Sequence, residues 1–298
     1  MSNEDKFRSG FISLIGRPNV GKSTLINALV GEKIAAVSEK PSTTRNKILG
    51  IRNTPTAQMI FLDTPGIHKA RGRLGKAMVQ TAVAAEQEAD VILMMIEVDS
   101  PFGKGDRFIV ENLPKPAILV INKIDKIKKG QILNIIQKSN EFEGKFTDVI
   151  PISAKNSDGT QELVSLIEGY LPEGPKYFPE DMYTDQPERF LAAELIREKI
   201  FQLTHKEIPY STAVTIEEFE DVPEKKLVRI SAVIYVERKN HKGIIIGKQG
   251  EMLKEIGSQA RADIERILGT KVFLELWVKV SDKWTDRENL IREFGYGS

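Results

Sequence analysis

The sequence predicts an α/β domain with a mixed, mostly parallel sheet and helices on both faces, followed by a smaller α+β domain. Two observations support this prediction. In the first part of the chain, short apolar runs typical of buried strands alternate with longer segments of helical spacing. In the last part, two strand-like segments follow each other directly and lie between helix-like ones. A proline-rich stretch separates the two patterns and marks a domain boundary.

In the first part, the strands and helices alternate along the chain. We expect strands at residues 11–15, 47–52, 58–62, 91–98, 117–121 and 149–152, and helices at 22–29, 75–88 and 161–170. Ligands of such sheets bind beyond the carboxyl ends of the strands. The residues that follow each apolar run are therefore the candidates for a binding site.

The last part has a different order. We expect a helix at 188–203, strands at 211–219 and 226–237, a basic, glycine-bearing turn at 239–250, a helix at 251–268 and a strand at 271–280. Trp277 alternates with apolar neighbours, so we expect it to be packed, and Trp284 is a candidate anchor for the C-terminus. The predicted domains are 1–172 and 188–298, with a linker at 173–187 that contains several prolines.

Composition limits the classes of protein that fit. Of 298 residues, 41% are hydrophobic and 29% are charged, which is typical of a soluble globular protein. The net charge of +1 gives no general attraction to nucleic acid or membrane, so any such surface is local. The absence of cysteine excludes disulfides and thiol catalysis and favours an intracellular location. We expect no signal peptide and no transmembrane helix, because the N-terminus is polar and the most apolar run, VILMMI, is short.

The strongest motif is GRPNVGKS, which matches G-x-x-x-x-G-K-S between a predicted strand and a predicted helix. Glycines allow the backbone amides to face the α- and β-phosphates, and the lysine adds positive charge at the β- and γ-phosphates. The serine hydroxyl is a candidate ligand for Mg²⁺. The predicted phosphate-binding residues are Gly16, Arg17, Pro18, Asn19, Val20, Gly21, Lys22, Ser23 and Thr24.

A second motif, DTPG, follows the strand at 58–62. Its aspartate is expected to hold the Mg²⁺ shell, through water, and its glycine amide to meet the γ-phosphate. Pro-Gly also occurs in ordinary turns, so this motif gains weight only beside the first. The residue after DTPG is Ile67, whose side chain cannot form a hydrogen bond to an attacking water. The predicted γ-phosphate and switch II residues are Asp63, Thr64, Pro65, Gly66 and Ile67.

Two further motifs indicate recognition of guanine. In NKID the aspartate can accept two hydrogen bonds from the guanine N1–H and amino group, a donor pair that adenine lacks. The lysine stem can lie against the base, and SAK can offer a backbone amide to guanine O6. The predicted guanine-binding residues are Asn122, Lys123, Asp125, Ser153, Ala154 and Lys155.

The order and spacing of the four motifs resemble the translation-factor-like GTPases. In that arrangement PSTTR, at residues 41–45, is the switch I region. A threonine of switch I completes the Mg²⁺ shell when GTP is bound, and Thr43 and Thr44 are both candidates.

The second domain contains a local basic segment, RKNHKGIIIGKQG, at residues 238–250. A G-x-x-G loop that opens a helix allows a nucleic-acid backbone to approach closely, and adjacent apolar residues can form a groove for about four nucleotides. A solvated helix N-terminus is the simpler alternative. The order αββααβ favours a type II KH domain, as does the local charge, since residues 181–298 hold 19 Lys and Arg against 21 Asp and Glu. The predicted RNA-binding residues are Arg238, Lys239, Lys242, Ile244, Ile245, Ile246, Gly247, Lys248, Gln249 and Gly250.

The combination of GRPNVGKST, PSTTR, DTPGIHK and NKID with a later IIIGKQG resembles the bacterial Era family of GTPases over almost the whole chain. The resemblance implies a P-loop GTPase domain and a type II KH domain with a C-terminal extension. It implies binding of GTP and GDP with Mg²⁺, slow hydrolysis of GTP, binding of the 3′ end of 16S rRNA, and a role in 30S ribosomal subunit assembly. It also implies a cytoplasmic location with some peripheral association with the cell membrane.

The family also bears on Ile67, which stands at the position where many GTPases have a glutamine that orients the attacking water. Era resembles GTPases in which a hydrophobic residue replaces the glutamine that orients water, and Ile67 fits that class. Several relatives with an asparagine in the phosphate loop use K⁺ near the phosphates, and Asn19 matches that position. Use of K⁺ is a hypothesis at this point.

Two other functions compete with an RNA-binding assembly factor. One is a GTPase that acts at membranes or in cell-cycle control, with the second domain as a protein-binding module. The other is a metabolic kinase that uses GTP, for which the sequence offers no signature of an acceptor pocket. Capture of RNA would distinguish the first alternative, and transfer of phosphate to a small molecule would favour the second.

Overall fold

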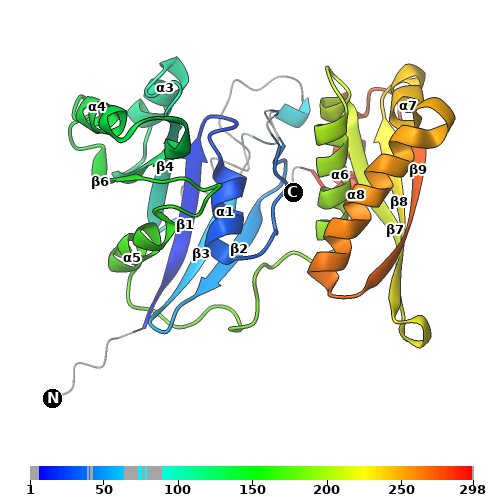
Figure 1. Cartoon of the computed structure of the whole chain (residues 1–298), viewed down its shortest axis with the longest axis horizontal. Helices are drawn as coiled ribbons and strands as arrows, with labels where there is room; N and C mark the ends of the chain where they lie inside the picture. Colours follow the sequence, from blue (N-terminus) through cyan, green and yellow to red (C-terminus); the bar gives the residue numbers. More distant parts are fainter. Residues whose placement is uncertain are drawn as a thin grey trace. The chain divides into compact units, whose positions relative to one another are not determined.

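The computed structural model describes residues 7–38, 40, 43–63, 73–75, 78 and 89–296, and the statements below concern these residues. The chain divides into two compact units, with the main boundary between Asp185 and Gln186 (Figure 1). In the described part of the chain, no helix is long and apolar enough to cross a lipid bilayer.

The first unit contains a six-stranded sheet of order β2-β3-β1-β4-β5-β6. β2 runs antiparallel to β3, and the other pairs of described strands are parallel, so the expected mostly parallel sheet is confirmed. β4 and β5 are buried almost throughout because helices cover parallel strands on both faces. The strands are β1 (Arg8–Gly16), β2 (Ile48–Asn53), β3 (Ala57–Asp63), β4 (Val91–Glu97), β5 (Ala117–Asn122) and β6 (Phe146–Pro151).

Helices follow the strands as the sequence predicts. Apolar side chains of α3 and α4 join those of β1, β4 and β5 in one cluster, while α1 contacts β2, β3 and α5. Most of the helix expected at 75–88 lies outside the described residues. The described helices are α1 (Lys22–Val30), α3 (Lys104–Glu111), α4 (Lys129–Ser139) and α5 (Thr160–Tyr170), with a short 3₁₀ turn η1 (Ile124–Lys126).

A strap formed by residues 172–183 is fixed to the first unit, although the sequence suggested a linker there. Its anchor is Gln58, which lies within β3 and is fully buried. The Gln58 amide nitrogen donates to the carbonyl of Phe178 at 2.8 Å, and its oxygen accepts from the amides of Tyr177 at 2.7 Å and Phe178 at 2.9 Å. The Phe178 ring packs against the apolar side chains of β3. The strap is therefore part of the first unit.

Replacing Gln58 by leucine should lower the free energy of unfolding by about 2–4 kcal/mol, because the backbone groups of Tyr177 and Phe178 lose their hydrogen bonds to the buried amide. We expect a lower melting temperature and faster limited proteolysis at residues 172–183. Gln161→Leu is the matched control, since that side chain is exposed and accepts one hydrogen bond from Arg52. Equal stability of the two variants would contradict the assigned role of Gln58.

The second unit has the order αββααβ, followed by a C-terminal helix. β8 pairs antiparallel with β7 and parallel with β9, and α6 and α8 contact each other and the sheet. The elements are α6 (Glu188–Leu203), β7 (Thr212–Val222), β8 (Leu227–Val236), α7 (Lys239–Ile246), α8 (Glu251–Leu268), β9 (Lys271–Val280) and α9 (Glu288–Glu293), with 3₁₀ turns η2 (Pro209–Ser211), η3 (Pro223–Lys225), η4 (Lys248–Gly250) and η5 (Trp284–Asp286).

The structure corrects the expected turn at 239–250, because most of it is the helix α7. Three consecutive isoleucines on a helix cannot share one face, since successive residues are about 100° apart. Ile245 is fully buried in the core of the second unit and is unavailable to RNA, whereas Ile244 is exposed and Ile246 is half-buried. The prediction that Ile245 lines a groove is therefore wrong.

The structure also corrects the environment of Trp277, which is 59% exposed rather than packed. Val272 and Val278 face the core from β9, and side chains at odd positions of this strand point to the opposite face of the sheet. Trp284 is fully buried, and its indole nitrogen donates to the carbonyl of Ser211 at 2.8 Å. It anchors the segment after β9 as expected.

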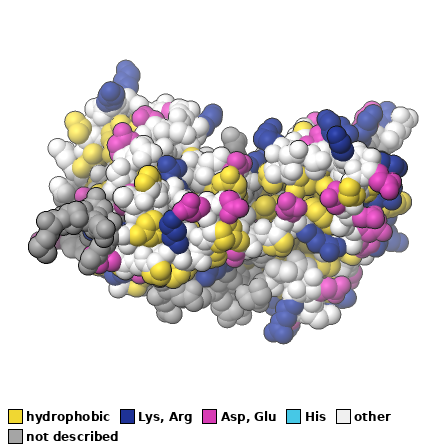
Figure 2. All heavy atoms as spheres, turned by 90° about the horizontal axis from the view of Figure 1, so that it is seen from below, with side chains coloured by type: hydrophobic (Ala, Val, Ile, Leu, Met, Phe, Trp, Pro, Cys, Tyr) yellow, Lys and Arg dark blue, Asp and Glu magenta, His cyan; other side chains and the backbone are white. Residues whose placement is uncertain are grey.

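Acidic and basic side chains are intermixed on the molecular face shown in Figure 2, in keeping with the nearly balanced composition. In the described part of that face, neither basic nor acidic side chains form a large patch of one charge. Electrostatic binding of a polyanion therefore requires a local cluster.

Candidate nucleotide and nucleic-acid sites

The phosphate loop connects β1 to α1 and follows the predicted pattern. Gly21 has a φ of 102°, and a Cβ atom there would lie 2.3 Å from the amide nitrogen of Asn122. The position therefore requires glycine for both its backbone conformation and its close contact. Asn19 has a φ of 67°, which brings a second residue of the loop into the left-handed region.

Lys22 begins α1 and is almost fully buried. Its ammonium donates to the carbonyl of Gly16 at 3.3 Å, so the side chain curls over the loop. Burial lowers the pKa of Lys22, and the nearby carboxylate of Asp63 partly opposes this shift. A phosphate beside this ammonium would favour its charged form.

Hydroxyl and carboxylate oxygens converge next to the loop. Ser23 Oγ donates to Asp63 Oδ2 at 2.8 Å and is hydrogen-bonded to Thr44 Oγ1 at 2.9 Å. Thr43 instead donates to the carbonyl of Lys40 at 2.9 Å. The structure thus brings Thr44, and not Thr43, to the oxygens that the sequence assigned to Mg²⁺. Oxygen donors of this kind suit Mg²⁺, which takes only one or two protein carboxylates and completes its shell with phosphates and water.

The remaining switch II residues, Thr64, Pro65, Gly66 and Ile67, lie outside the described residues. Their predicted contacts with the γ-phosphate stay predictions. Of this motif, the structure describes Asp63, which ends β3 and is fully buried.

Asn122, the first residue of NKID, forms hydrogen bonds to the loops of two other predicted motifs. Its amide nitrogen donates to the carbonyl of Val20 in the phosphate loop at 2.8 Å. Its amide oxygen accepts from the backbone N–H of Ala154 at 3.0 Å. Asn122 is 2% exposed, so it links the loops after β1, β5 and β6 from inside the protein rather than lining an open surface. This structural link was not expected from the sequence.

Of the two charged residues of NKID, Lys123 directly precedes the 3₁₀ turn η1 and Asp125 lies within it. Asp125 is exposed, and its Oδ1 accepts from Ser153 Oγ at 2.6 Å. The ammonium of Lys123 donates to the carbonyl of Asn19 at 2.7 Å. Lys155 is exposed. The loops after β1, β5 and β6 therefore meet at one edge of the sheet, with a carboxylate oriented by a hydroxyl.

In the second unit, α7 and α8 meet at the predicted G-x-x-G loop. Gly247 has a φ of 73° and a ψ of 178°, and a Cβ atom there would lie 2.7 Å from Cβ of Met252. This conformation is nearly restricted to glycine and ends α7. Lys248 and Gln249 are exposed at the turn. Arg238 and Lys239 are also exposed, and Lys242 is half-buried.

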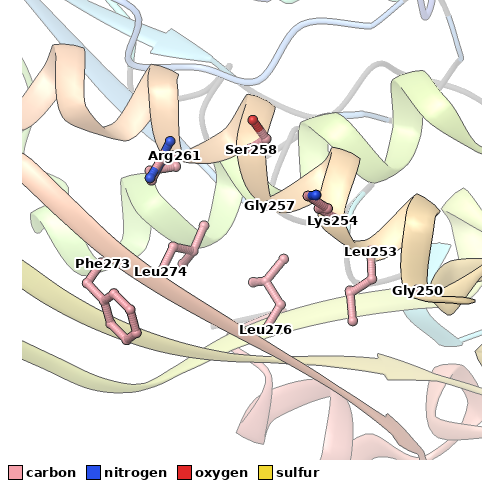
Figure 3. A pocket seen from close by; sticks show the side chains of 9 residues that line it. All are labelled: Gly250, Leu253, Lys254, Gly257, Ser258, Arg261, Phe273, Leu274 and Leu276. Carbon is pink, nitrogen blue, oxygen red and sulfur yellow. The ribbon is translucent and has the colours of Figure 1, made fainter.

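A groove of about 510 Å³ begins at Gly250 and runs between α8 and β9 (Figure 3). One stripe of α8 lines it with residues three or four apart, a spacing that places side chains on one helix face. Except for Gly250, sequence reasoning missed the groove residues, although this helical spacing was a usable signal. The groove is lined by Gly250, Leu253, Lys254, Gly257, Ser258, Arg261, Phe273, Leu274 and Leu276.

The fold and the meeting of these loops define a P-loop GTPase joined to a KH domain. A family model described as 50S ribosome-binding GTPase matches residues 11–123, and a KH domain model matches residues 207–285. The GTPase Era proteins of Geobacter sp. strain M21 and Geotalea uraniireducens strain Rf4 are each 52% identical to this chain, covering 99% and 98% of it and 99% of their own lengths. The chain belongs to the Era GTPase family.

Two solved structures resemble the whole chain. One is Era in complex with MgGDPNP and nucleotides 1506–1542 of 16S ribosomal RNA, with a TM-score of 0.94. The other is a variant of Aquifex aeolicus Era bound to GDP and AlF₄⁻, with a TM-score of 0.95. Each is 46% identical to this chain and matches 98% of it and 100% of the solved chain.

Proposed function

We propose that this protein is a GTP-hydrolysing switch that binds the 3′ end of 16S rRNA and assists assembly and maturation of the 30S subunit. The observation that carries the proposal is that one chain contains both a cluster of three nucleotide-motif loops joined by Asn122 and a groove between α8 and β9 that begins at the G-x-x-G loop. A relative at 46% identity that holds both a GTP analogue and this RNA supports it.

The nucleotide site has a role for each group of residues. Backbone amides of residues 16–24 and the ammonium of Lys22 bind the phosphates. Ser23, Thr44 and Asp63, the last through water, hold Mg²⁺, which supplies positive charge to the β- and γ-phosphates. Asp125 accepts hydrogen bonds from guanine, and the stem of Lys123 lies along the base. The backbone N–H groups of Ala154 and Ser153 already donate to Asn122 and to the carbonyl of Asp158, so recognition of guanine O6 falls to the amide of Lys155.

Ile67 offers no side-chain hydrogen bond to the attacking water. Intrinsic hydrolysis of GTP, in the absence of a stimulating molecule, is therefore slow. The proposed aid is K⁺ held near the phosphates by Asn19. GTP turnover should then be faster in K⁺ than in Na⁺ at equal ionic strength, and Asn19→Ala should remove the difference. Equal turnover in the two salts would contradict the proposal for K⁺.

We assign RNA binding to the groove between α8 and β9 and to the basic side chains in and beside it. The left-handed backbone of the G-x-x-G loop lets a phosphodiester backbone approach α8, and the apolar floor accepts unstacked bases. Lys254 and Arg261 in the groove and Lys248, two residues before Gly250 in the turn η4, supply positive charge. Ile244 and Ile246 lie on α7 beside the loop, and Ile245 is excluded by its burial.

The proposed location is the cytoplasm, with peripheral association with the cell membrane as a secondary property. Flotation of the protein with vesicles of anionic lipid tests that association, and a protein that remains entirely at the bottom of the gradient would contradict it.

GTP turnover in K⁺ buffer, with and without single-stranded RNA carrying the 16S 3′ end, tests the main proposal. A scrambled RNA of equal length is the control. Selective stimulation by the native sequence is the expected result, because occupancy of the groove would then be coupled to the switch regions. Tight GTP binding without any RNA effect would favour the alternative of a GTPase that acts at membranes or on protein partners.

A further inference from the structure

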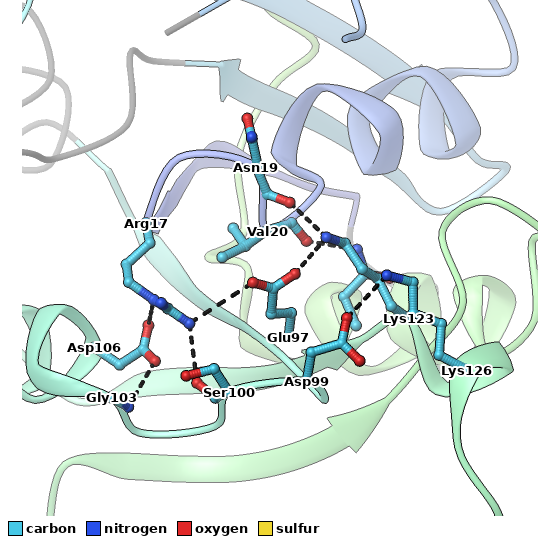
Figure 4. A network of polar contacts seen from close by, with 11 residues as sticks. Arg17, Asn19, Val20, Glu97, Asp99, Ser100, Gly103, Asp106, Lys123 and Lys126 are labelled. Carbon is cyan, nitrogen blue, oxygen red and sulfur yellow. Dashed lines mark hydrogen bonds and ion pairs between the residues drawn. The ribbon is translucent and has the colours of Figure 1, made fainter. Parts of the chain in front are cut away.

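Glu97, at the end of β4, joins two cations that come from different nucleotide motifs. Its Oε2 accepts from the ammonium of Lys123, and its Oε1 lies 3.9 Å from the guanidinium of Arg17 (Figure 4). Arg17 belongs to the phosphate loop, and Lys123 belongs to the guanine loop. The carboxylate therefore lies between the two loops.

Arg17 is held on its other side by a buried acid. Its Nε donates to Asp106 Oδ1 at 2.7 Å, and the other oxygen of Asp106 accepts from the backbone of Gly103 at 3.1 Å. Arg17 also donates to the carbonyl of Ser100 at 3.0 Å. Asp106 is fully buried and caps α3, so the guanidinium is attached to a fixed element. These contacts fix the Arg17 guanidinium, which lies 3.9 Å from the Glu97 carboxylate.

Lys123 connects Glu97 back to the phosphate loop through the carbonyl of Asn19. Asn19 and Lys123 both have a φ of 67°, a conformation that side-chain-bearing residues adopt rarely and at some cost. Such backbones persist when surrounding contacts hold them in place. The ion pair of Lys123 with Glu97 is one of these contacts, since it fixes the ammonium that donates to Asn19.

We propose that Glu97 is a positioning residue that holds Lys123 against the phosphate loop and thereby slows release of guanine nucleotide. The proposal rests on the proposed function, in which the stem of Lys123 lies along the base. Glu97 touches neither base nor phosphate in this account and acts through Lys123.

The size of the effect follows from exposure. The side chains of Glu97, Arg17 and Lys123 are 19%, 25% and 26% exposed. Their ion pairs are thus intermediate between fully exposed pairs, which contribute little to stability, and buried pairs, whose disruption costs most. Glu97→Gln keeps the shape and one acceptor but removes the charge. We expect GDP to dissociate about 5- to 10-fold faster, since the ion pair with Lys123 is replaced by a weaker hydrogen bond from the ammonium to a neutral amide oxygen.

The test measures dissociation of a fluorescent GDP by stopped flow, together with steady-state GTP turnover. Glu97→Gln should raise KM for GTP by a similar factor while changing kcat less than twofold, because KM approximates Kd when hydrolysis is slow. Asp99→Asn is the matched control. Asp99 lies two residues away, and its ion pair with Lys126 at 2.9 Å is about half exposed on both sides, so GDP release should not change. Glu97→Asp, which keeps the charge on a shorter stem, should give an intermediate rate.

A double-mutant cycle separates this role from general loosening of the site. Lys123→Met keeps most of the stem and removes the ammonium, so Glu97→Gln should have no further effect in that background. If Glu97→Gln still speeds release there, Glu97 does not act through Lys123 and the proposal is overturned. If Lys123→Met speeds release and Glu97→Gln alone does not, the proposal fails while the assigned nucleotide site stands. If Lys123→Met leaves release unchanged, the ammonium of Lys123 does not slow nucleotide release and the proposal is overturned.

Discussion

A variant with Asp125 replaced by asparagine is expected to bind GTP about 1,000-fold more weakly than the parent chain and to gain affinity for xanthosine triphosphate. The carboxylate accepts both from N1–H and from the amino group of guanine. An amide at this position presents a donor to that amino group, whereas xanthine carries a carbonyl oxygen there. The amide therefore suits xanthine and leaves guanine with an unsatisfied group.

The structure strengthens this expectation because Asp125 has a defined orientation. Ser153 Oγ donates to Asp125 Oδ1 at 2.6 Å, and the same hydroxyl can donate to the amide oxygen of asparagine. The amide nitrogen is then left to face the base. The variant should thus exchange one specificity for another rather than lose binding to all nucleotides.

Competition of GTP and xanthosine triphosphate against a fluorescent nucleotide measures this change as a ratio of affinities. Asp158→Asn is the control, because Asp158 is an exposed acid in the neighbouring loop whose backbone pairs with Ser153. It should leave the ratio unchanged. A variant at Asp125 that still prefers GTP would show that another group recognises the amino group of guanine.

Replacing Gly250 by aspartate should weaken binding of RNA with the 16S 3′ end by about 50-fold at moderate salt. Gly250 lines the groove at the start of α8, where the RNA backbone is expected to approach. A carboxylate there repels the phosphates. A Cβ atom at this position has no heavy atom within 4 Å, so the substitution introduces charge without a steric clash.

Gly269 provides a matched control at the other end of the same helix. Gly250 and Gly269 have φ values of 84° and 64°, and neither would bring an added Cβ within 4 Å of another atom. The two substitutions therefore carry a similar backbone strain, but Gly269 lies about 28 Å away along α8. Gly269→Asp should leave RNA affinity within twofold, as measured by fluorescence anisotropy. Equal losses in both variants would mean that strain, and not groove charge, explains the effect.

The sequence predicted most of the sheet because its buried strands are continuous apolar runs. β4 and β5, for example, consist of apolar residues apart from one polar residue at the end of each strand. The nucleotide loops were also predictable, since their residue types and spacing are dictated by phosphates and a base. Near Gly247 the sequence was less informative. KNHKGIII has little helical pattern, and contacts of Ile245 with the core decide that it folds as α7.

Other features depended on contacts between residues far apart in the chain. Nothing local distinguishes Thr44 from Thr43 until the hydroxyl of Ser23 is in place. Glu97 looks like the polar end of an apolar strand, and its role appears only when Arg17 and Lys123 are seen beside it. For Trp277 the alternation of side chains along the strand was recognised, but the side chain was expected on the packed face of the sheet and lies on the exposed face.

The strap has a consequence for fragments of this protein. β2 is an edge strand, and an uncovered edge can pair with the edge of another molecule and lead to aggregation. The backbone N–H of Ile51 in β2 donates to the carbonyl of Tyr183 at 2.8 Å, so the end of the strap occupies part of that edge. A fragment that stops at residue 172 would contain every described strand of the sheet and still leave this edge open. Poor solubility of such a fragment would reflect the missing cover, and a fragment that extends past Tyr183 would keep it.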